Sequence, residues 1–309
     1  MIAGSDRGSF AMSVAALTYI VFESPDCSGW ARFLERTVGL APAAVPGQGC
    51  FFRLDDAAWR IAVQPGQSER FAAIGLEFAS DAALDACLDR LKQAGVTAGE
   101  DRALAAERLV LRLFKTKDPC GNPIELVVGR SLGYEQFVSP AGVSGFVADD
   151  MGLGHIVIPA PQVETAKAFW LETIGLGLTD MMTFTLVPEA GPQTLYFMHA
   201  DNARHHSVAL FEAPSPVGLI HFMLEARTID DVGRFIDRCE RDGVHIASQF
   251  GRHSNDRMMS VYVMTPGGAM LEFGCDGLQI DWRNWIPTIS LVPDLWGHKF
   301  MGPPGVPAI

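Results

Sequence analysis

Two short stretches, LTYIVF at residues 17–22 and LGHIVI at residues 153–158, match each other in register and decide how the chain is organised. Both are rich in β-branched and aromatic residues, which favours β-strands. Each is followed by apolar residues at helical spacing and then by a Gly-Leu pair, at residues 39–40 and at residues 175–176. The two stretches therefore open equivalent units of a strand and a helix.

The repeat continues along both halves. Residues 74–96 and residues 222–244 each read as a strand, an N-cap at Ser80 or Thr228, and an amphipathic helix that stops at a glycine. The stretches DPCGNPIELVV and TPGGAMLEFG then close the two halves. Because the order of strand, helix and further strands occurs twice in each half, we predict an α+β fold of four βαβββ modules, paired into two domains.

The predicted domains are an N-terminal one at residues 1–135 and a C-terminal one at residues 150–309. The segment 129–150 is dense in Gly, Ser and Pro, as expected of a connection. Beyond Cys275 the sequence has no clear period and ends rich in Pro and Gly, which predicts a tail strapped onto the fold. Residues 1–11 are expected to be an extension.

Composition excludes several classes of partner. The 309 residues include 36 acidic and 24 basic ones, a formal charge of −12, so we expect no binding to nucleic acid or an anionic membrane. No apolar run reaches the roughly 18 residues of a membrane span, and the start lacks a signal-peptide pattern. The six cysteines are scattered without a C-x-x-C motif, as in a cytoplasmic protein with reduced thiols.

Histidine is distributed unevenly, because all eight histidines follow residue 150. Aligning the two halves on their repeats places two histidines and a glutamate at defined positions. The matched pairs are Tyr19 and His155, Ala73 and His221, and Glu125 and Glu272. We therefore predict a metal site in the C-terminal domain and the loss of that site from the N-terminal domain.

Two histidines and a carboxylate on one face of an octahedral ion leave three positions open, which suits Fe(II) that must hold an organic substrate and dioxygen. Zinc hydrolases use the same ligand types, but the H-E-x-x-H pattern is absent. Singly, His155 or His221 is more typical of a hydrogen-bonded strand histidine. Glu272 has the stronger claim, since a carboxylate in the apolar strand AMLEFG needs a cation or donors.

The stretch NARHHSVALF at residues 202–211 places two histidines at the start of a predicted strand. Neighbouring side chains on a strand point to opposite faces, so only one of His205 and His206 can face a pocket. Strand alternation does not say which one.

Several longer stretches in both halves are typical of one enzyme group. They include WRIAVQPG, PAGVSGFVADDMGLGHIV, ARHHSVAL, IHFMLEARTIDDVG, GRHSNDRMMSVY and LWGHK. From about Met12 onward the chain resembles the type I extradiol ring-cleaving dioxygenases of the vicinal oxygen chelate superfamily. The resemblance implies the glyoxalase-like fold of paired βαβββ modules, with iron in the C-terminal domain.

The resemblance also implies roles for individual residues. His155, His221 and Glu272 match the ligands of Fe(II), with Mn(II) as a possible substitute. His206 matches the acid/base of the active site and leaves His205 as a structural neighbour. His253 and Tyr262 match further catalytic residues, and Phe197, Asn255 and Asp256 match residues that contact or support the substrate.

The implied function is the cleavage, with dioxygen, of a substituted catechol such as a dihydroxybiphenyl, in the degradation of aromatic compounds by a homo-oligomeric enzyme. Two alternatives stay open. One is an isomerase or transferase of the same fold that uses a metal without oxygen. The other is a non-catalytic protein that binds an aromatic ligand. Activity without oxygen would favour the first, and tight binding without turnover would favour the second.

Overall fold

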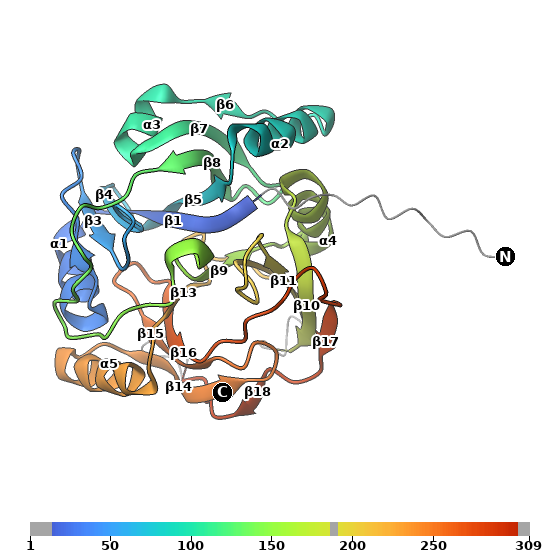
Figure 1. The fold of residues 1–309 in the computed structure, drawn as a ribbon. Coiled ribbons are helices and arrows are strands. Elements are labelled where there is room, and N and C mark those ends of the chain that lie inside the picture. Colours follow the sequence, from blue (N-terminus) through green and yellow to red (C-terminus); the bar gives the residue numbers. More distant parts are fainter. Residues whose placement is uncertain (1–13, 186–190, 302–309) are drawn as a thin grey trace.

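The computed structural model describes residues 14–185 and 191–301, which form two large sheets with helices packed against them (Figure 1). The expectation for residues 1–11 therefore lies outside the described residues. None of the described helices is long and apolar enough to span a bilayer.

The N-terminal half contains two modules in succession. The first comprises β1 (Val14–Ser24), α1 (Cys27–Arg32), the π-helix η1 (Phe33–Val38), β2 (Ala41–Pro42), β3 (Cys50–Arg53) and β4 (Ile61–Pro65). The second comprises β5 (Arg70–Phe78), α2 (Asp81–Gln93), β6 (Gly99–Glu100), α3 (Arg102–Arg108), β7 (Val110–Lys117) and β8 (Pro123–Arg130).

The C-terminal half repeats this order after the short 3-10 helix η2 (Asp149–Met151). Its first module comprises β9 (His155–Pro159), α4 (Val163–Ala168), the π-helix η3 (Phe169–Ile174), β10 (Gly177–Phe184), β11 (Gln193–His199) and β12 (Val208–Phe211). Its second comprises β13 (His221–Glu225), α5 (Ile229–Asp242), β14 (Ile246–His253), β15 (Met259–Met264) and β16 (Met270–Cys275).

Sheet topology confirms the predicted repeat of modules. The N-terminal sheet has the order β2-β3-β4-β1-β5-β8-β7-β6, and the C-terminal sheet has β10-β11-β12-β9-β13-β16-β15-β14 between two additional edge strands. Replacing each strand of the first sheet by its counterpart in the second reproduces the same order. The α+β class and the paired βαβββ modules are therefore confirmed.

The register of the strands confirms the alignment of the two halves. Tyr19 on β1 pairs with Gly75 on β5, which in turn pairs with Glu125 on β8. In the other sheet His155, Met223 and Glu272 form the same row across β9, β13 and β16. His155 and Glu272 therefore occupy the positions of Tyr19 and Glu125.

The helices of these modules start and stop for local reasons. The predicted N-caps are present, because the Ser80 hydroxyl accepts a hydrogen bond from the backbone of Ala83 and Thr228 accepts one from Asp231. The π-helices η1 and η3 end at Gly39 and Gly175, whose φ angles of 92° and 95° favour glycine.

The two halves share one hydrophobic core. In addition, an arginine from each half binds the C-terminal end of a helix in the other half. Arg90 on α2 donates to the carbonyl oxygen of Thr173 at the end of η3, over 2.9 Å. Arg238 on α5 donates to the carbonyl oxygen of Thr37 at the end of η1, over 2.7 Å. Because these guanidinium groups satisfy helix carbonyls of the opposite half, the halves pack as one unit.

The tail beyond Cys275 lies along the C-terminal sheet and includes two strands that the sequence did not predict. It contributes two short strands, β17 (Thr288–Ser290) beside β10 and β18 (Asp294–Trp296) beside β14, which become the two edges of the C-terminal sheet. Three-residue strands are too short to show a period of two. The helix α3 was also not predicted, because its seven residues make only about two helical turns.

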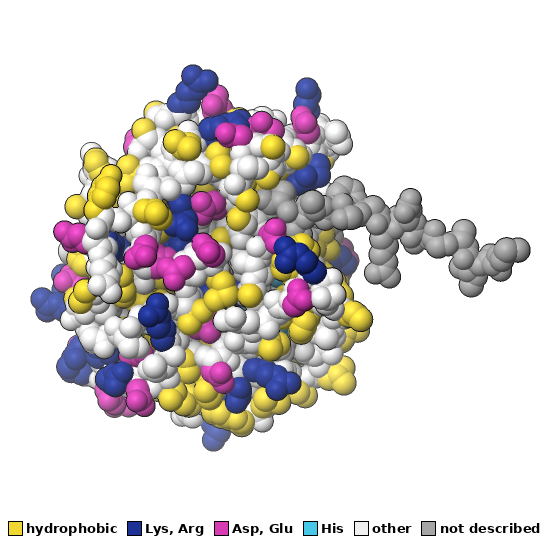
Figure 2. Space-filling model, in the orientation of Figure 1, with side chains coloured by type: hydrophobic (Ala, Val, Ile, Leu, Met, Phe, Trp, Pro, Cys, Tyr) yellow, Lys and Arg dark blue, Asp and Glu magenta, His cyan; other side chains and the backbone are white. Residues whose placement is uncertain are grey.

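The surface shows no large area of one charge on the face seen in Figure 2, where Lys, Arg, Asp and Glu are intermixed. Large exposed apolar side chains gather on the tail instead, for example Ile286, Ile289 and Leu291 around β17.

Candidate metal centre

Three adjacent strands bring the predicted metal ligands together. His155 begins β9, His221 begins β13, and Glu272 lies on β16. The Nε2 atoms of the two histidines are 3.2 Å apart, and the Glu272 Oε2 atom lies 3.1 Å from His155 and 3.3 Å from His221. The three donor atoms thus form a small triangle.

This triangle has the dimensions of one face of a metal coordination shell. Ligand atoms that meet an ion at about 2.1 Å and at right angles stand about 3.0 Å from one another. The carboxylate of Glu272 is only 1% exposed, and among residues 14–185 and 191–301 no Lys or Arg lies within ion-pair distance of it. Because a buried carboxylate needs a cation or several donors, the donor set fits a divalent metal ion.

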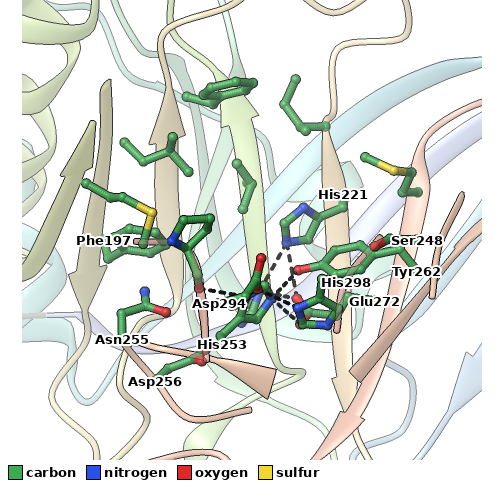
Figure 3. Close-up of a pocket in the computed structure, with 18 of the residues that line it drawn as sticks. Phe197, His221, Ser248, His253, Asn255, Asp256, Tyr262, Glu272, Asp294 and His298 are labelled. Atoms are coloured by element: carbon green, nitrogen blue, oxygen red, sulfur yellow. Dashed lines mark hydrogen bonds and ion pairs between the residues drawn. The ribbon is translucent and has the colours of Figure 1, made fainter. Parts of the chain in front are cut away.

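Side chains of β15 and β14 contact the other carboxylate oxygen of Glu272, Oε1. The Ser260 hydroxyl donates to Glu272 Oε1 over 2.6 Å, and His253 Nε2 lies 3.4 Å from the same oxygen. Tyr262, two residues beyond Ser260 on the same strand, has its hydroxyl 2.7 Å from His253 Nε2. Figure 3 shows His221, His253, Tyr262 and Glu272 gathered in one cluster. These contacts leave Oε2 to face the two histidines.

The two neighbouring histidines lie just before β12 and have different surroundings. The ring of His206 stacks on that of His155 with centroids 3.9 Å apart, and Phe197 on β11 meets it edge-on at 5.0 Å. The ring of His205 packs edge-on against Trp285 at 5.9 Å. His206 lines the cavity described below, whereas His205 lies behind it.

Burial controls the protonation of these groups. It is the main reason why the pKa of His155 falls to about 4 and that of His206 falls well below its usual value. Burial alone would raise the pKa of Glu272, but hydrogen bonds from the surrounding histidines hold it well below its usual value. At neutral pH His155 therefore presents a neutral imidazole and Glu272 a carboxylate, which are the forms that bind metals.

A cavity of about 330 Å³ lies against the metal ligands. Its polar side holds His253, Asn255, Asp256 and Tyr262, as Figure 3 shows. Its remaining wall is mainly apolar: Val157, Met182, Phe184, Leu195, Phe197, Phe211, Ile220, Met270, Pro293 and Phe300. A mainly apolar cavity with a few polar groups on one side is typical of a site for a small organic molecule.

The matched positions of the N-terminal half form no such site. The Tyr19 hydroxyl donates to Glu125 over 2.6 Å, and Arg108 of α3 binds both carboxylate oxygens at 2.9 and 3.0 Å. The ring of Trp59 packs against Tyr19, and Phe51 packs edge-on against Trp59. A guanidinium group occupies the neighbourhood in which the other half presents metal ligands.

Sequence reasoning missed several polar residues of the site, among them Ser260, Asp294 and His298. Ser260 alternates with Tyr262 on one strand, so period-two spacing was a usable signal for it. Asp294 and His298 come from the tail, and they line the cavity together with Pro293 and Phe300. The tail has no periodicity, and the stretch LWGHK was the one available signal for His298.

Comparisons with known proteins show that this chain is similar to a group of dioxygenases. Residues 152–273 match the glyoxalase/bleomycin resistance protein/dioxygenase superfamily, and residues 17–66 match the family described as dihydroxybiphenyl dioxygenase BphC D1. The chain is 40% identical over 291 residues to a biphenyl-2,3-diol 1,2-dioxygenase of Metapseudomonas furukawaii, which covers 93% of this chain and 94% of that protein.

Two further similarities agree with these matches. An iron-dependent extradiol dioxygenase of Rhodococcus jostii (strain RHA1) is 36% identical over 299 residues, covering 94% of this chain and 98% of that one. The crystal structure of BphC, a halotolerant catechol dioxygenase, superposes with a TM-score of 0.88 at 31% identity, covering 96% of this chain and 98% of the other.

Proposed function

The chain belongs to the extradiol dioxygenases of the vicinal oxygen chelate superfamily, and from this membership we propose that it cleaves the ring of a substituted catechol with dioxygen. One observation supports the proposal above all. The donor atoms of His155, His221 and Glu272 lie 3.1 to 3.3 Å apart at the wall of a mainly apolar cavity. The reaction is assigned to residues 150–309, and residues 1–135 form a supporting domain.

The metal ion is proposed to be Fe(II), held by His155, His221 and Glu272. A bound Fe(II) would lower the pKa of the catechol hydroxyls and offer open neighbouring positions to the catechol and to dioxygen. The name of the iron-dependent relative in Rhodococcus jostii supports this choice. Mn(II) is the alternative ion, because the same donor set serves either metal.

His206 is proposed to move protons between the substrate and the site. Burial keeps its pKa well below the usual value, so the ring is neutral at pH 7 and able to accept a proton. Its Nδ1 atom lies 3.1 Å from His205 Nδ1, and its Nε2 has no hydrogen-bond partner among the described residues. That atom can therefore take a hydroxyl proton from the catechol and return it to a product oxygen.

The apolar wall supports a catechol with a bulky, ring-bearing substituent, such as a dihydroxybiphenyl. The two hydroxyls would lie at the metal ligands, with His253, Asn255, Asp256 and Tyr262 around them. The substituent would extend between Phe184, Leu195 and Phe211. Burying such apolar surface contributes about 25 cal/mol per Å².

The test is to mix anaerobically purified, iron-loaded protein with catechol, 3-methylcatechol and 2,3-dihydroxybiphenyl and then admit air. We expect oxygen uptake and a yellow ring-opened product, with the highest kcat/KM for the biphenyl. No oxygen uptake with any catechol would contradict the proposal. Turnover that continues without oxygen would favour the isomerase or transferase, and binding without turnover would favour the ligand-binding protein.

We also propose that the protein forms a homo-oligomer and is located in the cytoplasm. Ile286, Ile289 and Leu291 are 80%, 65% and 87% exposed around the edge strand β17, and such apolar edges favour pairing with another chain. We expect a homo-oligomer by sedimentation, with Ile289→Asp shifting it to smaller species. Six free cysteines support a cytoplasmic location.

A further inference from the structure

The tail joins the two ends of the C-terminal sheet. β17 pairs in parallel with β10, and β18 pairs antiparallel with β14, although β10 and β14 lie at opposite ends of the eight repeated strands. Residues 291–293 connect the two short strands. Further along, Lys299 and Met301 pair by backbone hydrogen bonds with Gln249 and Ala247. The tail therefore closes the sheet around the cavity, and the N-terminal sheet has no equivalent strands in the described chain.

This closure brings Asp294 to the polar side of the cavity. Its Oδ1 atom lies 2.8 Å from His253 Nδ1 and 2.6 Å from His298 Nδ1. A carboxylate only accepts hydrogen bonds, so both Nδ1 atoms face it as donors. The Nε2 atom of His253 is thereby directed to the Tyr262 hydroxyl, 2.7 Å away. Asp294 thus fixes the orientation of two imidazole rings.

His298 connects the tail to the carboxylate of the metal site. Its Nε2 atom lies 3.2 Å from the Ser260 hydroxyl and 3.1 Å from the Ser260 carbonyl oxygen. The Ser260 hydroxyl in turn donates to Glu272 Oε1 over 2.6 Å. A continuous chain of hydrogen bonds therefore runs from Asp294 through His298 and Ser260 to Glu272 (Figure 3 shows its labelled ends).

The backbone around His298 is arranged to bring its ring close to β14. Gly297 and His298 have φ angles of 78° and 48°, in the left-handed region that a non-glycine residue rarely adopts. A Cβ atom on Gly251 would lie 2.3 Å from the backbone nitrogen of His298. Strain of this kind persists only where the surroundings impose it, and it is concentrated at functional sites.

We propose that Asp294 and His298 are positioning residues of the metal site. Asp294 holds His253 against Tyr262, and His298 acts through Ser260 to turn Glu272 so that Oε2 faces His155 and His221. The proposal rests on the proposed function, since it assigns these residues to the same centre. Partners of this kind are worth about 10–100-fold in metal affinity or activity.

A matched pair of variants separates the two contacts of His298. Asparagine places its amide nitrogen near the former Nδ1 and keeps the contact with Asp294, whereas glutamine reaches toward Ser260. We expect His298→Asn to weaken Co(II) binding about 10–100-fold and His298→Gln to weaken it less. Co(II) titration by visible absorbance measures this without turnover. Leu295→Ala, at an exposed position of β18, is the control and keeps wild-type affinity.

Asp294→Asn tests the contact with His253. We expect one metal ion per chain to be retained and kcat for the best catechol to fall about 10–100-fold, with a smaller change in KM. Gly251→Ala displaces the tail and is expected to combine both defects.

Three results would overturn the proposal. In the first, the variants lower Tm but the folded proteins bind Co(II) and turn over like wild type, which leaves the network merely structural. In the second, His298→Asn and His298→Gln bind Co(II) equally and as tightly as wild type. In the third, wild type binds two ions per chain and Asp294→Asn binds one. That result would mean that His253, Asp294 and His298, whose donor atoms lie close together, hold an ion of their own. A wild type that binds Co(II) yet turns over no catechol would instead contradict the proposed function, and the Co(II) comparison would still stand.

Discussion

Glu125 and Glu272 occupy the same place in the two halves of the molecule, on matching strands and in matching rows of the sheet. Both are buried, with exposures of 5% and 1%. In the N-terminal half the charge is neutralised by Arg108, which belongs to the chain itself. In the C-terminal half the partners are two imidazoles and, by our proposal, an exchangeable metal ion. A buried carboxylate needs a positive partner in both places, and the source of that charge distinguishes a structural site from a reactive one.

The space around the two carboxylates differs in the same way. In the N-terminal half aromatic rings pack beside Tyr19, and Arg108 of the helix α3 binds Glu125. In the C-terminal half the corresponding apolar residues surround a cavity, and the tail supplies its last wall. The same scaffold therefore places either an arginine or two histidines beside the buried glutamate, depending on the side chains that face inward.

The largest effect is expected when the two glutamates are exchanged for alanine one at a time. Glu272→Ala removes a proposed ligand, so metal content and turnover should both be lost, beyond the about 10–100-fold typical of outer partners. Glu125→Ala should lower Tm and leave the metal content of the folded protein unchanged. Elemental analysis and oxygen uptake measure both. Metal loss in the Glu125 variant would break the proposed separation between the halves.

The second-largest effect is expected at the two adjacent histidines of the C-terminal half. His206→Ala should keep the metal and lower kcat about 10²–10⁴-fold, because it removes the proposed acid/base. His205→Gln is the control and should remain near wild type, since its ring packs behind the cavity. Equal metal loss in the two variants would contradict the assigned roles.

A stability measurement tests the structural carboxylate. Arg108→Leu leaves Glu125 buried with only the Tyr19 hydroxyl beside it, which should cost about 3–5 kcal/mol of the free energy of unfolding. The double variant Arg108→Leu/Glu125→Leu removes the charge as well and should recover most of that loss. Urea unfolding measures both proteins. If the single and double variants were equally unstable, Arg108 would matter for packing and not for charge.

Acid should weaken the half that contains all the histidines. Burial lowers the pKa of His199 and of His205 from 6.5 to about 4 in the folded protein. The unfolded chain therefore binds more protons than the folded one between these values. Each of the two residues should reduce the free energy of unfolding by about 1.4 kcal/mol per pH unit as the pH falls from 6.5 toward 4.

Urea unfolding at several pH values measures this slope. His199→Gln should make the slope shallower, and so should His205→Gln. A slope that stays the same in both variants would place the acid sensitivity elsewhere.

Much of the fold follows from the sequence because the repeat is strong. The match of LTYIVF with LGHIVI, extended by the capped helices after Ser80 and Thr228, predicts the modules and the row that contains His155 and Glu272. The tail strands β17 and β18 were beyond such reasoning. Each has three residues, and each is stabilised by pairing with an edge strand that only the folded sheet provides.

The residues of the site also fall into those that the sequence could identify and those that it could not. Residues on repeated strands, such as His155, His221 and Glu272, could be identified by comparing the two halves. The resemblance to a family then supplied His206, His253 and Tyr262. Asp294 had no counterpart to compare, because the N-terminal half has no tail, and its contacts depend on distant strands that meet only in three dimensions.

The π-helices offer a record of how the chain arose. The wide turns η1 and η3 occupy the first module of each half, while α2 and α5 in the second modules are regular. An extra residue at the same place in two modules requires one insertion if it preceded a duplication, and two if it followed. The simplest history is that a single module doubled, one copy gained the insertion, and the resulting pair doubled again. On this history the glutamate was kept in both halves, whereas His155 and His221 diverged from Tyr19 and Ala73 after that second event.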